Sequence, residues 1–155
     1  MEAQQTPELL AQQLWDIEQI KQLKARYFRF LDTRNWDGFA DLFTEDCKHY
    51  GYFADDPSRT LVGLAEYLPF LKAVVTPGRS VHHGHMPEIT LTSPTEATGI
   101  WAMFDHVESQ PASGPVNIEG YGHYHETYRK CADGKWRISS KRLDRLWVNS
   151  LSTPD

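Results

Sequence analysis

The feature of this chain that most constrains its fold is a change of pattern near residue 79. Before that point, apolar residues recur every three or four positions, as they do in amphipathic helices. After it, the chain is rich in Val, Ile, Thr, Tyr and Trp and reads as strands. Helices followed by antiparallel strands are typical of an α+β domain whose helices pack on one face of the sheet. We therefore expect an α+β fold in which a curved sheet encloses a pocket.

The first half of the chain predicts three helices. In residues 7–31 the spacing is helical for Ile17, Ile20, Leu23, Tyr27 and Leu31. Further elements are expected as follows: a short helix over 36–43, an extended segment over 47–53, a surface turn at 55–58, and a third helix over 61–75 that contains Pro69 and ends at 76–78.

The second half predicts four long strands joined as a meander. Turn-forming residues interrupt the β pattern at 93–95, at 109–115 and at 133–134. Of these turns, Asp133-Gly134 is the clearest hairpin. The tail after Leu151 is expected to be frayed.

Composition limits the kinds of partner. The chain has 155 residues, of which 40% are hydrophobic, and this suits one domain spanning residues 1–155. A net charge of -5 and the lack of a dense Lys/Arg stripe argue against nucleic acid and anionic membranes as partners. The polar N-terminus does not resemble a signal peptide, and no apolar run is long enough to span a membrane. We expect a cytoplasmic protein.

Histidines and a carboxylate mark a candidate site. His82, His83 and His85 are followed by Asp105, which ends a run of otherwise apolar residues. A buried carboxylate is costly unless something pairs with it or uses it. One reading is an internal ion pair with Arg142 or Arg145. The other places Asp105 in an apolar cavity, where burial would raise its pKa and suit it to donate a proton or bind a polar group of a substrate.

Several motifs carry a resemblance to a known family. They lie at 17–20, 25–27, 31–36, 42–46, 81–83 and 133–138. In order and spacing, the chain resembles the SnoaL-like branch of the nuclear transport factor two-like superfamily, which includes scytalone dehydratase and bile acid 7α-dehydratase. The resemblance spans nearly the whole chain. It implies a cone-shaped half barrel, formed by a curved, mostly antiparallel sheet and closed by three N-terminal helices.

The resemblance also implies catalytic roles. Family members that eliminate water or HCl use a histidine on the first long strand, which falls on His82, and a carboxylate at the end of the first helix, which falls on Asp32. The same pattern places Tyr27 and Asp105 in the site. Dehydrochlorinases carry a lysine where this chain has Tyr27, which argues against that activity. Without the resemblance, Asp32 reads equally well as a solvated turn residue and Tyr27 as a core tyrosine.

His83 competes with His82 for the role of base. Strict alternation backwards from Leu91 and Ile89 places His83 and His85, not His82, on their face. The resemblance selects His82. Pro87 predicts a bulge between these segments, and a bulge changes which face a side chain uses. We favour His82 as the base.

Further residues are candidates for substrate binding. The pocket wall is expected to include Tyr50, Trp101 and Tyr124, together with His83 and an arginine on the last strand, for which the resemblance leaves Arg142 and Lys141 open. The abundance of aromatic residues suggests a bulky, largely apolar cyclic ligand with a few oxygens, such as a steroid-like, terpenoid or polyketide molecule.

The favoured function is a dehydratase-type lyase that needs no cofactor and uses His/Asp acid-base catalysis. Alternatives are an isomerase or cyclase with the same pocket, and a binding module without catalysis. A metal-dependent enzyme is a further alternative, because His83/His85 with Glu88, and His123/His125 with Glu126, resemble paired ligands on neighbouring strands. Such sheets commonly pair with a second copy, so a homo-oligomer, dimer or trimer, is expected.

Overall fold

The first element is a long helix, as the sequence predicts. The structure, a computed structural model, describes residues 6–52, 56, 58–76, 78–110 and 114–151. Helix α1 spans Pro7–Asp32 and begins with Thr6 as N-cap, whose hydroxyl accepts a hydrogen bond from Leu9 N at 3.2 Å. Its apolar stripe is buried against the rest of the chain, and the buried residues include Ile20, Leu23, Tyr27 and Leu31.

The other two helices are shorter than predicted. Helix α2 covers only Trp36–Ala40, because Phe43 already opens a strand, β1 (Phe43–Tyr50). A two-residue strand, β2 (Leu61–Val62), occupies the predicted start of the third helix, so α3 spans Gly63–Val75. Pro69 lies inside α3. Of the predicted turns at 55–58 and 76–78, residues 55, 57 and 77 lie outside the described part of the chain, as do residues 152–155 of the tail.

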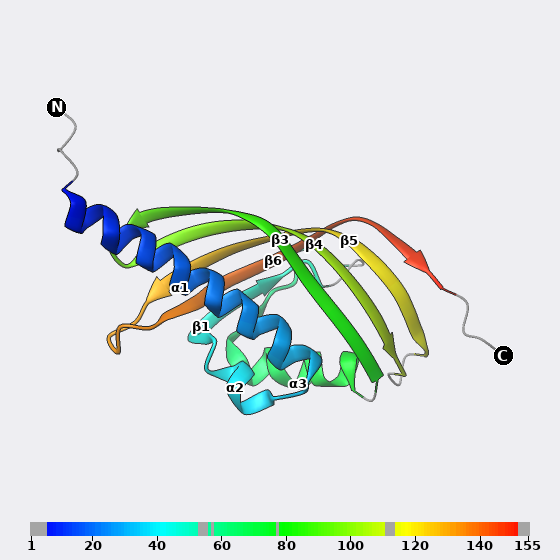
Figure 1. Cartoon of the computed structure of the whole chain (residues 1–155). Coiled ribbons are helices and arrows are strands. Elements are labelled where there is room, and N and C mark those ends of the chain that lie inside the picture. The colour runs from blue at the N-terminus through cyan, green and yellow to red at the C-terminus, as the bar shows by residue number, and fades with distance from the viewer. Residues whose placement is uncertain (1–5, 53–55, 57, 77, 111–113, 152–155) are drawn as a thin grey trace.

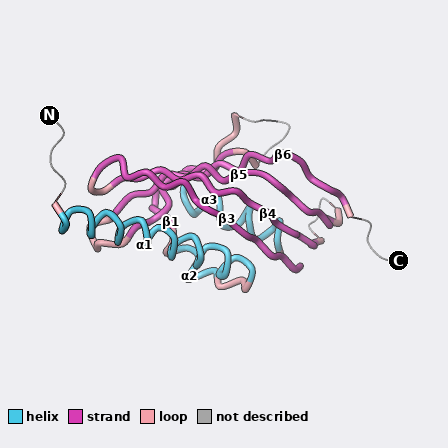
Figure 2. Tube along the Cα trace, turned by 45° about the horizontal axis from the view of Figure 1, so that its top comes forward, coloured by secondary structure: helices cyan, strands magenta, loops and turns pink. Residues whose placement is uncertain are grey.

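The four long strands form the predicted meander. They are β3 (Gly78–Ser93), β4 (Glu96–Ser109), β5 (Val116–Lys130) and β6 (Trp136–Ser150). The sheet has the order β2-β1-β6-β5-β4-β3, and β1 runs parallel to β6 whereas the other neighbours are antiparallel. The sheet is curved and unclosed, with the helices on its concave side (Figure 1). The start of α1 and the end of β6 lie at opposite ends of the molecule (Figures 1 and 2).

Alternation along β4 decides which side chains enter the concave interior. Every second residue is buried, among them Trp101, Met103, Asp105 and Val107. The charged Asp105 thus shares its face with large apolar side chains, as the sequence predicts. None of the described helices is long and apolar enough to cross a membrane.

A bulge interrupts β3 where Pro87 predicts one. The pairing of β3 with β4 shifts register between His85 and Glu88, and Met86 adopts a positive φ of 35°. Alternation counted from Ile89 therefore does not carry through to the histidines. N-terminal to the bulge, His82 is buried, with 8% of its surface exposed, whereas His83 is exposed.

Candidate active site

Asp32 and His82 form a hydrogen-bonded pair. The ring Nδ1 of His82 lies 2.7 Å from Asp32 Oδ1, and the backbone N–H of His82 donates to Asp32 Oδ2 at 2.9 Å. Because the carboxylate accepts, Nδ1 carries a proton and Nε2 is left as the basic ring nitrogen. His82 also lines the cavity described below. The pair thus turns a basic nitrogen toward an enclosed space.

The position of Asp32 at the end of α1 requires compensation, since a carboxylate there meets the negative end of the helix dipole. Ser80 supplies part of it, because its hydroxyl donates to Asp32 Oδ1 at 2.9 Å. Arg34 supplies further compensation. Its guanidinium donates to Ser80 Oγ and to the terminal carbonyls of two helices, Leu31 O in α1 at 2.6 Å and Val75 O in α3 at 2.9 Å. Arg34 therefore ties together the segment that presents the pair.

Asp105 stands beside His82 and is paired with Arg145. The two residues are cross-strand partners of β3 and β4, so their side chains leave the sheet on the same side. Arg145 Nη1 and Nη2 donate to the two oxygens of Asp105 at 2.9 and 2.7 Å. Of the two readings of Asp105, the ion pair is thus the one that the structure contains. Both oxygens of Asp105 accept from the guanidinium, an arrangement that suits an acceptor and not the proton donor of the apolar reading.

A glycine makes that ion pair possible. Gly120 on β5 lies between the two strands concerned, directly opposite Asp105. A Cβ at this position would overlap the guanidinium of Arg145 and collide with Asp105. The missing side chain leaves the space through which Arg145 of β6 reaches across β5 to β4.

Tyr27 forms a second polar pair with Lys141. The Lys141 amine donates to the Tyr27 hydroxyl at 2.5 Å, and both residues are 1% exposed. Burial and, second, the positive charge of Lys24 lower the pKa of Lys141 to about 7. Burial raises the pKa of the Tyr27 hydroxyl well above its usual value. Tyr27 is thus a neutral hydrogen-bonding group, available beside an amine that titrates near neutrality.

One cavity unites these groups. It has a volume of about 250 Å³ and lies between α1, α3 and the concave face of the sheet. Tyr27, His82, Asp105 and Tyr124 line it, with Lys141 and Arg145. Its remaining wall is mostly apolar and includes Leu31, Phe70, Leu71, Val74, Val107 and Leu143. A basic nitrogen, hydrogen-bond donors and an apolar wall suit a small, largely apolar molecule with few oxygens.

Four of the predicted binding residues lie outside the cavity wall. Tyr50 and Arg142 instead line a groove of about 430 Å³ together with Ile100 and His125. Arg142 forms an ion pair with Asp144 at 2.8 Å. Of the two alternatives for this position, Lys141 lines the cavity and Arg142 does not. Alternation along β6 turns these neighbouring residues to opposite faces.

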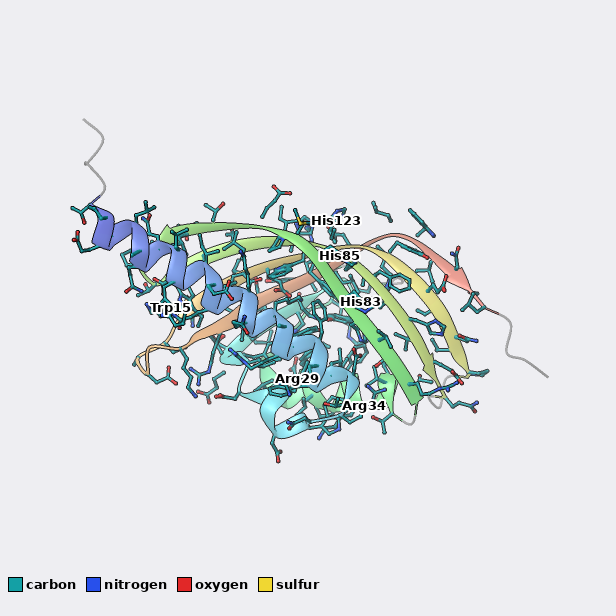
Figure 3. The ribbon with its side chains drawn as sticks, in the orientation of Figure 1. Trp15, Arg29, Arg34, His83, His85 and His123 are labelled. Atoms are coloured by element: carbon teal, nitrogen blue, oxygen red, sulfur yellow. The ribbon has the colours of Figure 1, made fainter. Side chains whose placement is uncertain are left out.

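The other two are His83 and Trp101. His83 lies on the outer face and stacks on Phe104, with ring centroids 5.9 Å apart. Figure 3 labels it with His85 and His123 on the part of the sheet away from α1. Trp101 is buried in a cluster with Met103 and Tyr124, and its indole N–H donates to Tyr128 Oη at 2.8 Å. Core packing satisfies Trp101 without any ligand.

The paired-histidine metal alternative finds no support in the geometry. The two pairs do not lie on neighbouring strands as predicted, because His83 and His85 are on β3, His123 and His125 are on β5, and β4 lies between these strands. Glu126 turns to the interior, where it accepts from Lys24 at 2.5 Å. Across the described ranges, no three His, Cys, Asp or Glu side chains gather as metal ligands.

Sequence reasoning gave Arg145 and Lys141 no more than minor parts. Arg145 appeared only as one of two possible partners of Asp105, and Lys141 only as an alternative to Arg142. The signal that could have found Arg145 is the pair Gly120 and Gly122 in a strand, since glycine inside a strand marks a close approach by another group. Gly122 sits opposite Arg145 in the β5–β6 ladder.

The fold and the site define a curved-sheet α+β protein with a histidine–carboxylate pair at an internal cavity. Residues 12–142 match the SnoaL-like domain, and the chain belongs to this family. It is 30% identical over 141 residues to the "Probable cyclase FGR4" of Gibberella zeae, covering 86% of this chain and 93% of that protein.

Solved structures with the same fold include two from Novosphingobium. The "Putative Scytalone Dehydratase" of Novosphingobium aromaticivorans superposes with a TM-score of 0.78 at 22% identity, covering 94% of this chain and 93% of that one. Hexachlorocyclohexane dehydrochlorinase LinA-type3 of Novosphingobium barchaimii superposes with a TM-score of 0.76 at 19% identity, covering 92% and 94%. At these identities the likeness concerns the fold.

Proposed function

We propose that the protein is a dehydratase-type lyase that acts on a hydroxylated cyclic molecule with a carbonyl group, without a cofactor. The observation that carries the proposal is the position of His82, with Nδ1 on Asp32 and the ring on the cavity wall. An imidazole held in this way is oriented to act as a general base, and general acid-base catalysis contributes about 10²–10⁴-fold. The names of the relatives, a dehydratase, a dehydrochlorinase and a cyclase, support a reaction of this type.

In the proposed reaction His82 Nε2 removes a proton from a carbon next to the carbonyl. Asp32 stabilises the imidazolium that results. The electron pair of the broken C–H bond forms the new double bond as the C–OH bond breaks, and the imidazolium returns its proton to the departing hydroxyl, so water leaves and His82 is regenerated.

The two polar pairs that line the same cavity bind the oxygens. Tyr27 with Lys141, and Arg145 held by Asp105, are donors placed before the charge on the substrate oxygen develops, which is how fixed donors lower a barrier. Asp105 acts in this scheme by orienting Arg145, as a positioning residue.

A panel of cyclic β-hydroxyketones, followed by mass spectrometry of the products, tests the proposal. We expect loss of one water from at least one member, with a rate that falls by about 10²-fold or more in His82→Ala. Asp32→Asn keeps the size of the side chain and removes its charge, so it should also slow the reaction. Full activity in His82→Ala would contradict the mechanism.

An isomerase or cyclase with the same pocket is the second candidate, and the 30% identity to a probable cyclase favours it. The same base removes the same proton, but no hydroxyl is expelled: the proton returns to another carbon, or the resulting carbanion closes a ring. The products distinguish the candidates, because an isomer keeps the mass of the substrate. Ligand binding without turnover, unchanged in His82→Ala, would instead indicate a binding module.

A further inference from the structure

Lys141 is a buried amine in an unusual electrostatic position. Its ammonium nitrogen lies 4.7–5.5 Å from the ring centroids of four tyrosines, namely Tyr27, Tyr52, Tyr67 and Tyr124. Lys141 lines the cavity, and the hydrogen bond from its Nζ to the Tyr27 hydroxyl fixes the end of the side chain there. The amine is therefore sheltered from bulk water at the wall of the cavity.

The neighbouring buried charges are paired, and Lys141 is the exception. Lys24 has Glu126 at 2.5 Å and Arg145 has Asp105 at 2.7 Å. Within the part of the chain that the structure describes, Lys141 has no carboxylate within 4.0 Å of its nitrogen. A buried ammonium without a counter-charge is costly, so burial favours the neutral amine. In agreement, the pKa of Lys141 lies at about 7 because of burial and the charge of Lys24.

We propose that Lys141 is a nucleophilic amine that captures an aldehyde or ketone in the cavity as an imine. A neutral lysine beside another cationic group in a desolvated pocket is the arrangement that activates amines for this chemistry. Imine formation at Lys141 differs from the reaction proposed for His82, since capture of a carbonyl compound needs neither a base at the His82 position nor elimination of a substrate hydroxyl. The proposal therefore stands apart from the dehydratase function.

The step balances with groups already present. The lone pair of Nζ forms a bond to the carbonyl carbon as the C=O π bond breaks, and one amine proton moves to the oxygen to give a carbinolamine. The nitrogen lone pair then forms the C=N bond as the C–O bond breaks, and the hydroxyl leaves as water with the second amine proton. The Tyr27 hydroxyl, 2.5 Å from Nζ, is placed to relay these protons. No oxidant, reductant or metal is consumed.

Reductive trapping with benzaldehyde and sodium cyanoborohydride at pH 7 tests the proposal on the full chain. Peptide mapping by mass spectrometry locates each benzylated lysine. An exposed lysine with a pKa of about 10.4 is almost wholly protonated at pH 7, so we expect Lys141 to be labelled at least tenfold faster than the exposed Lys21. Because the Lys141 pKa is about 7, raising the pH above 8 should accelerate its labelling little.

Three variants and one denatured control sharpen the test. Lys141→Met should lose the fast adduct, whereas Lys21→Met, its exposed counterpart on α1, should keep it. His82→Ala should keep the adduct as well, which separates this proposal from the dehydratase function. Labelling of exposed lysines alone, or equal rates at position 141 in folded and urea-unfolded wild type, would overturn the proposal, and both readings come from the wild type even if a variant fails to fold.

Discussion

Replacing Lys141 with methionine should stabilise the protein near neutral pH and flatten its pH dependence. The fold lowers the pKa of this amine from 10.5 to about 7. In the unfolded chain the amine regains an ordinary pKa of about 10.4. Between these values the unfolded state binds one more proton than the folded state, so the free energy of unfolding of the wild type rises with pH throughout this window. Below it, both states are protonated and the full cost of burying the charge is present.

The magnitude follows from the same two values. Well inside the window, the slope approaches ~1.4 kcal/mol per pH unit. Methionine is apolar and unbranched, is similar in length to lysine and has no group that titrates. The stability advantage of Lys141→Met over the wild type should therefore shrink by about 2.5 kcal/mol between pH 8 and pH 10.

Urea unfolding of both proteins at pH 8, 9 and 10 measures this difference. Subtraction removes the titrations that the two proteins share. Lys21→Met, which removes an exposed amine, should give a curve parallel to that of the wild type. A difference between Lys141→Met and the wild type that stays constant with pH would refute the reasoning, because the amine would then titrate alike in the folded and unfolded chains.

Other predictions concern the two carboxylates of the site. Gly120→Ala places a methyl group where the Arg145 guanidinium lies, which leaves Asp105 buried without its partner, and it should cost about 3–5 kcal/mol in urea unfolding; a loss below about 1 kcal/mol would mean that the pair can rearrange. In a double-mutant cycle, Asp105→Asn and Arg145→Met together should lower the free energy of unfolding by about 1–3 kcal/mol less than the sum of the single changes. Additive losses would argue against coupling between the two residues. Asp32→Ala removes the acceptor of three hydrogen bonds and should lower the unfolding free energy by about 2–3 kcal/mol, whereas Glu96→Ala, an exposed control, should change it little; similar losses would show that the Asp32 contacts contribute nothing.

The homo-oligomer and the cytoplasmic location stay predictions. Light scattering on the purified protein reports the first directly. Apolar side chains are exposed at the end of β6, namely Leu146, Trp147 and Val148, which is in keeping with the expectation of self-association.

Much of the fold was predictable because its signals are local. Helical spacing predicted α1 to within one residue at its C-terminal end, and turn residues predicted the four-stranded meander. The errors lie where tertiary pairing competes with local pattern. Phe43 is apolar and continues a helical spacing, yet it starts β1, because the parallel ladder with β6 pairs it with Ile138. Leu61 likewise joins a short strand opposite His49.

The candidate site divides in the same way. The sequence by itself determined that a tyrosine, two carboxylates and a histidine occur in the order typical of the SnoaL-like family. It also determined that Asp105 shares a face with large apolar residues. Only the tertiary structure decided that His82 and not His83 contacts Asp32, because the bulge at Met86 changes the face that each histidine uses. Periodicity cannot count through such a break.

Partners that come from different strands were also beyond the sequence. Arg145 reaches Asp105 because Gly120 leaves a gap between their strands. The pKa of Lys141 falls to about 7 because the fold buries the amine near Lys24, whose own partner is Glu126. The sequence determines which side chains exist and which face of an element they share. The energy of a charge depends on the partners and the solvent around it, and only the packing of helices against the sheet decides those.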